Sequence, residues 1–219
     1  MSMPVTRRWT ADDVRALIRE DRAWPRYELI DGELIVTPAP RSPHQIAISE
    51  FHFLLFGYLQ QNGVGIVLTS PYDLELKPGT ITQPDVFVMP DYTGFDGVEL
   101  ATAEATDVRE LLLAIEVLSP ASIRTDRVVK RDFYLANGVI DYWIVDLDAR
   151  IVERWRPAQE TPEILRATME WAPAGRDPLR IDLPALFDRV EASSVAVERF
   201  VRVKGHEQRR GGRPDGDDM

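Results

Sequence analysis

Apolar and polar positions along the chain form short blocks that predict both strands and helices. The run 111–118 is apolar at every position except Glu116, and Ser119-Pro120 closes it. An aliphatic run of this length is typical of a buried strand. Nearer the start, apolar runs flank Asp31-Gly32, a pair that favours a tight turn, so a β-hairpin is predicted over 26–37.

Helices are predicted where capping residues precede apolar positions spaced three or four apart. Thr10 is the expected N-cap of a helix that reaches about residue 21. Ser42 is the expected cap of a second helix, which has Pro43 at its first position and ends at Asn62-Gly63. The other predicted elements are strands at 65–69, 72–77 and 84–89, a polar, acidic loop at 90–108, a helix at 125–136, strands at 142–146, 151–156 and 164–171, and a short helix at 184–189.

This order of elements predicts an α+β fold, with a central mixed β-sheet flanked by helices and preceded by the N-terminal hairpin. We expect a single domain over residues 1–203, with its core at about 26–156, because a chain of 219 residues suits one sizeable core. Residues 204–219 are rich in Gly, Arg and Asp and have no apolar periodicity, which predicts a disordered tail.

Composition narrows the class of protein. Apolar residues make up 44% of the chain and charged residues 28%, as in ordinary globular domains. No apolar stretch approaches the roughly 18 residues that span a bilayer, and no hydrophobic segment follows Arg7-Arg8, so neither a membrane association nor a secretory signal is expected. The chain has no cysteine, which excludes disulfides, thiolate zinc sites and cysteine nucleophiles. A cytoplasmic location is therefore expected.

The net charge of −10 counts against a broad, non-specific grip on nucleic acid, which depends on many Lys and Arg contacts to phosphate. It leaves open a small site where metal ions neutralise local acidic groups, or a basic patch on an acidic surface.

Two carboxylates stand next to predicted core. A lone ionised Glu116 in a buried strand is costly unless it binds a metal, takes part in proton chemistry or closes an ion pair. Asp85 follows Pro84 at the entry of the predicted strand 84–89. If these two strands are neighbours, both carboxylates can reach one hard cation, and Mg²⁺ favours such a set completed by waters and phosphate oxygens.

The helix after Glu116 supplies further polar groups. Asp126, Lys130 and Tyr134 are spaced four apart and share one face. A lysine beside a metal-bound water can orient it or stabilise charge on a phosphoryl oxygen. Two acids, a metal and a lysine suit the hydrolysis of a phosphodiester.

Several ordered strings resemble a known family. They are Tyr27-Glu-Leu-Ile-Asp-Gly-Glu-Leu, Gln83-Pro-Asp-Val, Glu116-Val-Leu-Ser-Pro, Asp126-Arg-Val-Val-Lys130, Tyr134 and Gly138-Val-Ile-Asp-Tyr-Trp-Ile-Val-Asp146. Over roughly residues 27–156 the chain resembles the Uma-type putative restriction endonucleases of the PD-(D/E)xK nuclease superfamily. The resemblance implies a restriction-endonuclease-like fold, dependence on Mg²⁺, with Mn²⁺ as a substitute, and a DNA substrate.

The resemblance assigns roles residue by residue. Asp85 matches the first acid and Glu116 the second. Independently of the resemblance, we expect the backbone carbonyl of Val117 as a third metal ligand. The superfamily places its lysine two residues after the second acid, where this chain has Leu118. The Uma-type subgroup instead carries lysine on the next helix, which matches Lys130. Glu28, His44, Asp126 and Tyr134 are candidates for supporting roles at the same site.

Other interpretations of these residues stay open. Glu116 and Lys130 could form only a buried structural ion pair, or the chain could be a catalytically inactive nucleic-acid- or protein-binding module that keeps the nuclease fold. Asp126 with Lys130 also fits an ordinary surface pair on a helix. Cleavage of both DNA strands would need two active sites, so a homodimer is an expected assembly.

Overall fold

A six-stranded mixed sheet forms the centre of the computed structural model, which describes residues 8–19, 24–90 and 110–210, without the side chains of residues 174 and 202–210. The strand order is β3-β4-β5-β6-β7-β8, and β5 and β6 are the parallel pair. The strands are β3 (Gly65–Thr69), β4 (Val86–Pro90), β5 (Leu113–Val117), β6 (Tyr142–Asp146), β7 (Ile151–Trp155) and β8 (Glu163–Leu165).

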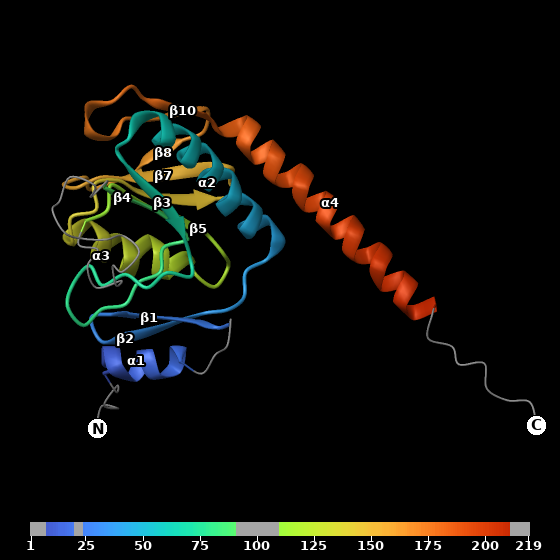
Figure 1. Ribbon diagram of the computed structural model, residues 1–219, viewed down its shortest axis with the longest axis horizontal. Helices are drawn as coiled ribbons and strands as arrows, with labels where there is room; N and C mark the ends of the chain where they lie inside the picture. The colour runs from blue at the N-terminus through green and yellow to red at the C-terminus, as the bar shows by residue number, and fades with distance from the viewer. Residues whose placement is uncertain (1–7, 20–23, 91–109, 211–219) are drawn as a thin grey trace, which may run out of the picture.

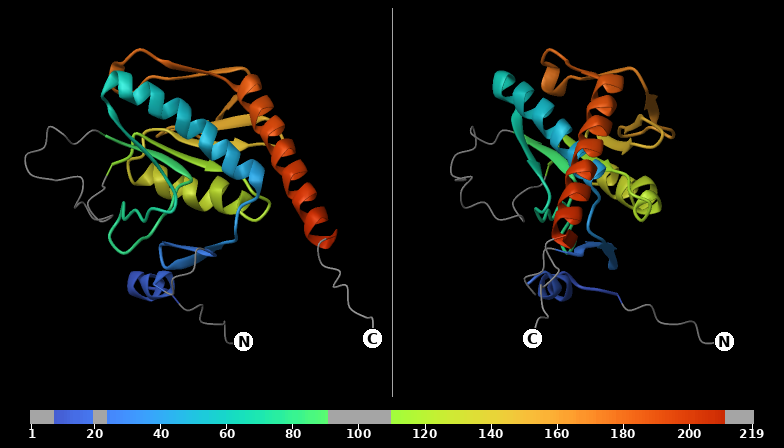
Figure 2. Two further views of the ribbon diagram at one scale, coloured as in Figure 1. Left: turned by 45° about the vertical axis from the view of Figure 1, so that its right-hand side comes forward. Right: turned by 90° about the vertical axis from the view of Figure 1, so that its right-hand side faces the viewer.

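Helices cover both faces of this sheet (Figures 1 and 2). The helix α2 (Ser42–Asn62) packs on one face with Ile115 and Trp143, and α3 (Arg131–Ala136) packs on the other with Ala114. A π-helix, η2 (Thr125–Lys130), leads directly into α3. Together they form the connection between the parallel strands β5 and β6. Because successive side chains of a strand point to opposite faces, Glu116 shares the α3 face with Ala114.

The N-terminal hairpin lies apart from the central sheet. It consists of β1 (Arg26–Ile30) and β2 (Glu33–Thr37), joined by Asp31-Gly32 with φ angles of 49° and 83°. These positive angles are the ones a two-residue hairpin turn requires, and they explain the Asp-Gly pair. The helix α1 (Ala11–Ile18) packs on the hairpin, and a β-bridge between Leu29 and Ile81 joins the hairpin to the segment that precedes β4.

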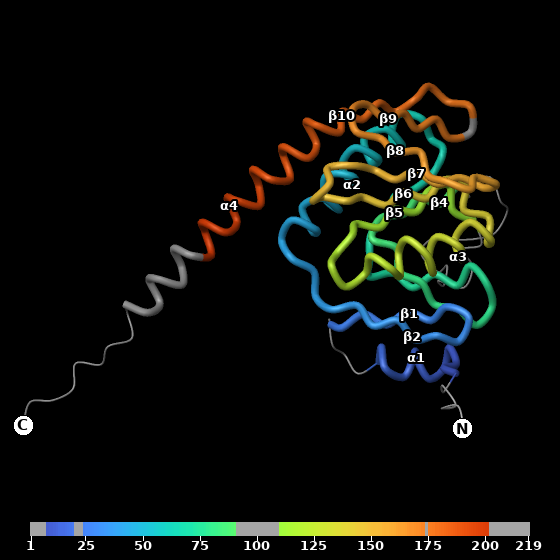
Figure 3. Tube along the Cα trace, turned by 180° about the vertical axis from the view of Figure 1, so that it is seen from behind, coloured from blue at the N-terminus to red at the C-terminus, as the bar shows by residue number. Residues whose placement is uncertain are grey.

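The C-terminal part adds a second small sheet and a long helix. β9 (Thr168–Trp171) pairs with β10 (Leu179–Asp182), and the short η3 (Pro173–Gly175) lies between them. The helix α4 (Leu183–Arg210) starts against α2 and then extends away from the body of the protein (Figures 1 and 3). In the described part of the chain, no helix combines the length and the apolar character needed to cross a membrane.

Most predicted elements are present, and Thr10 caps α1 through a capping box with Asp13. Four expectations are wrong. The N-cap of α2 is Arg41, whose backbone is extended, so Ser42 is already helical. The predicted strand 72–77 is reduced to one bridge between Leu74 and Thr82.

The other two corrections concern the C-terminal part. The run 164–171 splits between β8 and β9, which belong to different sheets. The short helix expected at 184–189 is instead the start of α4, which continues to Arg210. The loop predicted at 90–108 lies outside the described residues except for its first position, as does the rest of the expected tail, 211–219.

Candidate active site

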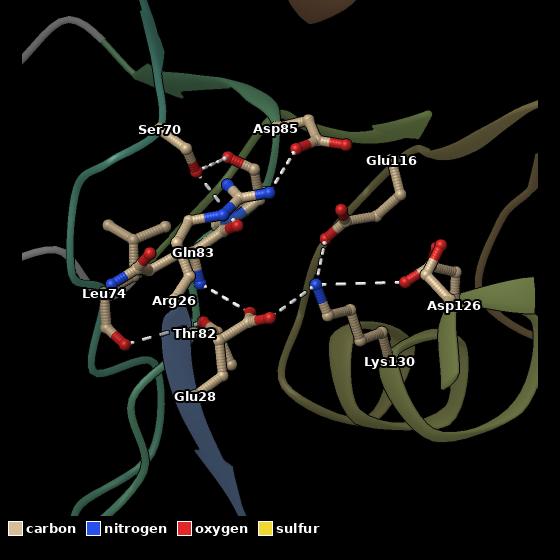
Figure 4. Close-up of polar contacts among 12 residues, drawn as sticks. Arg26, Glu28, Ser70, Leu74, Thr82, Gln83, Asp85, Glu116, Asp126 and Lys130 are labelled. Atoms are coloured by element: carbon tan, nitrogen blue, oxygen red, sulfur yellow. Dashed lines mark hydrogen bonds and ion pairs between the residues drawn. The ribbon is translucent and has the colours of Figure 1, made fainter. Parts of the chain in front are cut away.

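Three carboxylates converge on the ammonium group of Lys130 (Figure 4). Its Nζ lies 2.9 Å from Glu28 Oε2, 3.0 Å from Glu116 Oε1 and 3.8 Å from Asp126 Oδ1. None of the four residues is more than 4% exposed. Charged groups are rarely buried this deeply unless they are paired, so the cluster is a costly feature that the fold maintains.

The residues of this cluster come from three parts of the fold, namely β1, β5 and η2. Glu116 projects from β5 toward α3, where Tyr134 Oη donates a hydrogen bond to Glu116 Oε1 at 3.3 Å. Asp126 and Lys130 both lie in η2, whose wide turn is closed by a bond from the Arg131 N–H to the Asp126 carbonyl. Such π-turns are frequent at functional sites.

Glu28 reaches the cluster from the hairpin. Its Oε2 contacts Lys130, and its Oε1 accepts a hydrogen bond of 2.8 Å from the backbone N–H of Gln83. That second bond ties β1 to the segment just before β4. Glu28 therefore points into the protein, with an exposure of 1%.

Asp85 lies next to this cluster and has its own partners. Its Oδ1 is 3.0 Å from Arg26 Nη2, and its Oδ2 is 3.1 Å from His44 Nε2. The backbone N–H of Val117 also donates to Oδ2, at 3.0 Å. Because Val117 follows Glu116 directly, this bond holds the Asp85 carboxylate beside the end of β5 (Figure 4).

The balance of burial and neighbouring charges raises the pKa values of both Glu116 and Lys130. Burial raises the pKa of Glu116 well above its usual value, and Asp85 raises it further, although Lys130 opposes the change. Burial alone would lower the pKa of Lys130, but Glu116, Glu28 and Asp126 outweigh it and raise that pKa well above its usual value. Lys130 therefore stays protonated.

The pKa values of Asp85 and Asp126 are also shifted, and in opposite directions. Burial would raise the pKa of Asp85, but the hydrogen bond from His44 and the charges of Arg26 and Lys130 hold it well below its usual range. Burial raises the pKa of Asp126 to about 6, against the pull of Lys130. Carboxylates with pKa values pushed this far apart are characteristic of functional sites.

A small opening leads to the cluster. It has a volume of about 30 Å³, enough for about two water molecules. One wall is the end of the hairpin, residues 35–38, and the other is the start of η2 with Ala121 and Ser122. Lys130 and Asp126 also line it, so the cluster borders this opening.

The donor set fits a hard divalent cation. Among the described residues, no three His, Asp or Glu side chains already form a ready-made metal site. Mg²⁺ does not require one, because it is commonly held by one or two carboxylates, with waters and phosphate oxygens completing its shell. Asp85 and Glu116 would supply these carboxylates, and the carbonyl of Val117 stays a predicted third ligand.

The structure brings together all the candidates named from the sequence. His44 contacts Asp85, while Tyr134 contacts Glu116 and is buried, as Lys130 is. The surface-pair alternative for Asp126 and Lys130 is wrong, because both are buried. Arg26, the partner of Asp85, was not among the candidates named from the sequence. Its signal is its position two residues before Glu28, which places both on one face of β1.

Comparison with known proteins agrees with this architecture. Among curated proteins, none matches the chain. A crystal structure from Anabaena variabilis, described as a putative nuclease belonging to DUF820, is similar at 23% identity with a TM-score of 0.64, covering 83% of this chain and 99% of the other. This similarity supports the predicted nuclease-like α+β fold. The family model described as "Uma2: Putative restriction endonuclease" matches residues 11–183, and the chain therefore belongs to the Uma2 family.

Proposed function

We propose that the protein is a metal-dependent endonuclease that hydrolyses DNA phosphodiester bonds. In this proposal Asp85 and Glu116 hold Mg²⁺, with Mn²⁺ as a substitute and the carbonyl of Val117 as a further ligand. Lys130 is the third catalytic residue. Membership of a family described as restriction endonucleases supports the reaction class, and the geometry around Lys130 supports the choice of residues.

The observation that carries the proposal is an excess of buried negative charge. Four carboxylates, those of Glu28, Asp85, Glu116 and Asp126, face two permanent cations, Arg26 and Lys130, together with His44. A purely structural cluster would balance its charges, because each unpaired buried charge costs several kcal/mol. In the metal-free protein the raised pKa of Glu116 means that a proton offsets part of this excess. A bound divalent cation would replace that proton and supply the missing positive charge.

The residues of the chain then have distinct tasks. Lys130, protonated at Nζ and fixed by Glu28 and Glu116, would stabilise the negative charge that builds up on the phosphoryl oxygens. Because its pKa is raised, it is unsuited to accept a proton from water. The opening beside Lys130 has room for an attacking water. Bound Mg²⁺ would lower the pKa of such a water and neutralise the developing charge.

Calorimetric titration of Mg²⁺ and Mn²⁺ tests the metal site first. We expect binding to the wild-type protein and none to the double variant Asp85→Ala/Glu116→Ala. Incubation of supercoiled plasmid with each protein then tests the reaction, since an endonuclease converts it to nicked or linear forms. Absence of metal binding at millimolar concentrations, with and without DNA, would refute the proposal.

The role of Lys130 has a kinetic test. If Lys130 acts on the transition state, Lys130→Ala should lower turnover far more than DNA affinity. Unchanged turnover would remove this lysine from the scheme. Cleavage of both strands would require two such sites, so light scattering on the DNA complex should detect a homodimer.

A second function, that of a catalytically inactive binding module, has two observations in its favour. Asp85 is already fully engaged by Arg26, His44 and the Val117 N–H, and Leu118 occupies the usual lysine position of the superfamily. DNA or partner binding that persists without any divalent metal binding would favour this alternative.

A further inference from the structure

Arg26 is a buried arginine with few partners. Its side chain is 10% exposed, and Nη2 donates to Asp85 Oδ1 at 3.0 Å. Its Nε is buried and has no hydrogen-bond partner among the described residues. A guanidinium has five N–H groups, and leaving one buried and unpaired is unfavourable.

Other arginines of this fold use the same edge of the guanidinium fully. Arg154 binds both oxygens of Asp141 through Nε at 2.6 Å and Nη2 at 3.0 Å. Arg127 likewise places Nε and Nη2 on Glu153. Arg26 uses Nη2 of this edge but not Nε. Its Nε–H and Nη2–H fork could therefore still bind an anion.

The proposed function would bring a phosphate to the position of Arg26. Its guanidinium lies 5.1 Å from the ring centroid of Trp24, which supports it from one side. The unpaired Nε–H lies on the same edge as Nη2, next to the Asp85 carboxylate. Nδ1 of His44, the other partner of Asp85, is also buried without a hydrogen-bond partner among the described residues. Two unused polar atoms thus flank the carboxylate beside which a phosphodiester must lie if Asp85 takes part in its hydrolysis.

We propose that Arg26 is a phosphate-binding residue, whose Nε–H and Nη2–H fork holds a non-bridging oxygen of a DNA phosphate beside Asp85. This inference rests on the proposed function, because it needs DNA as the substrate. The planar fork matches the geometry of phosphate oxygens, which a lysine ammonium does not. Arg26 therefore binds and orients the DNA backbone, while Lys130, held by Glu28 and Glu116, acts on the phosphoryl group that reacts.

The test is DNA binding measured at several salt concentrations. A short random-sequence duplex is titrated with the wild-type protein and with Arg26→Met and Arg26→Gln, by fluorescence anisotropy, with Ca²⁺ in place of Mg²⁺ to withhold turnover. Arg26→Gln keeps an N–H donor for Asp85 and so separates phosphate binding from support of that carboxylate. The matched control is Arg180→Met, because Arg180 is 73% exposed and pairs with Glu170 on the small sheet.

We expect both Arg26 variants to bind DNA about 10- to 100-fold more weakly than the wild type. The slope of log K against log salt should become about one unit shallower, as for the loss of one phosphate contact, whereas the control keeps the wild-type slope. An unchanged slope would overturn the inference and leave Arg26 as a partner of Asp85 alone, with the nuclease proposal intact. Wild-type protein that binds no DNA would overturn both.

One measurement needs no variant and so covers the case in which both variants fail to fold. The Nε–H resonance of Arg26 in a ¹H–¹⁵N spectrum of the wild-type protein should shift when the duplex is added. A resonance that stays in place while the DNA is bound would contradict the inference.

Discussion

Replacing Asp126 by asparagine should stabilise the metal-free protein at neutral pH. Asp126 is 2% exposed and lies 3.8 Å from Lys130, the longest of the three contacts to that ammonium. Lys130 keeps Glu28 and Glu116 in the variant, so it is not left unpaired. The substitution removes one negative charge from a cluster that has too many.

The magnitude follows from the pKa of Asp126, which is about 6 in the folded protein against 3.8 for the ordinary carboxyl. The folded state therefore binds this proton more tightly than the unfolded state. Stability due to Asp126 is fully present below about pH 4 and is lost as the pH rises through about 6. A difference of about 2 in pKa corresponds to about 3 kcal/mol. Above pH 6, Asp126→Asn should thus gain up to about 3 kcal/mol in free energy of unfolding, with little difference near pH 4.

Urea denaturation in EDTA buffer, at pH values between about 4 and 8, measures this gain. The control is Asp132→Asn in α3, where the side chain is 64% exposed and the pair with Arg131 contributes little. An Asp126→Asn protein that is less stable than the wild type at pH 7.5 would refute the reasoning. That result would mean that Asp126 is needed as a partner of Lys130 and that the cluster is a structural ion network.

Three further substitutions examine the same cluster. Glu116→Gln in metal-free buffer should keep or raise the thermal unfolding temperature, since burial already disfavours the charged form; a sharp drop would indicate a structural bridge with Lys130. Lys130→Met should lower the free energy of unfolding by about 3–5 kcal/mol in urea denaturation, because it leaves carboxylates buried without a cation. Tyr134→Phe removes one hydrogen bond to Glu116 and should cost about 1 kcal/mol in the same assay, so a loss as large as that of Lys130→Met would contradict the assigned contact.

The sequence determined the strands and turns whose patterns lie within a few neighbouring residues. The apolar run around Glu116 predicted β5, and Asp31-Gly32 predicted the turn between β1 and β2. Local signals also misled where packing decided the outcome. The segment 72–77 has an apolar pattern but pairs only through Leu74, and α4 continues far past its apolar first turns to Arg210.

In the candidate site, too, the sequence predicted individual residues but not the contacts between distant elements. An acid in a buried strand, a second acid after proline and a lysine on the following helix could all be recognised along the chain. That Glu28 shares Lys130 with Glu116, and that Arg26 holds Asp85, could not, because these contacts join a separate hairpin to the central sheet. Periodicity defines which face of a strand or helix a side chain occupies, but the partner across that face depends on how distant elements pack. Only the tertiary structure decided that four carboxylates meet with too few cations to balance them.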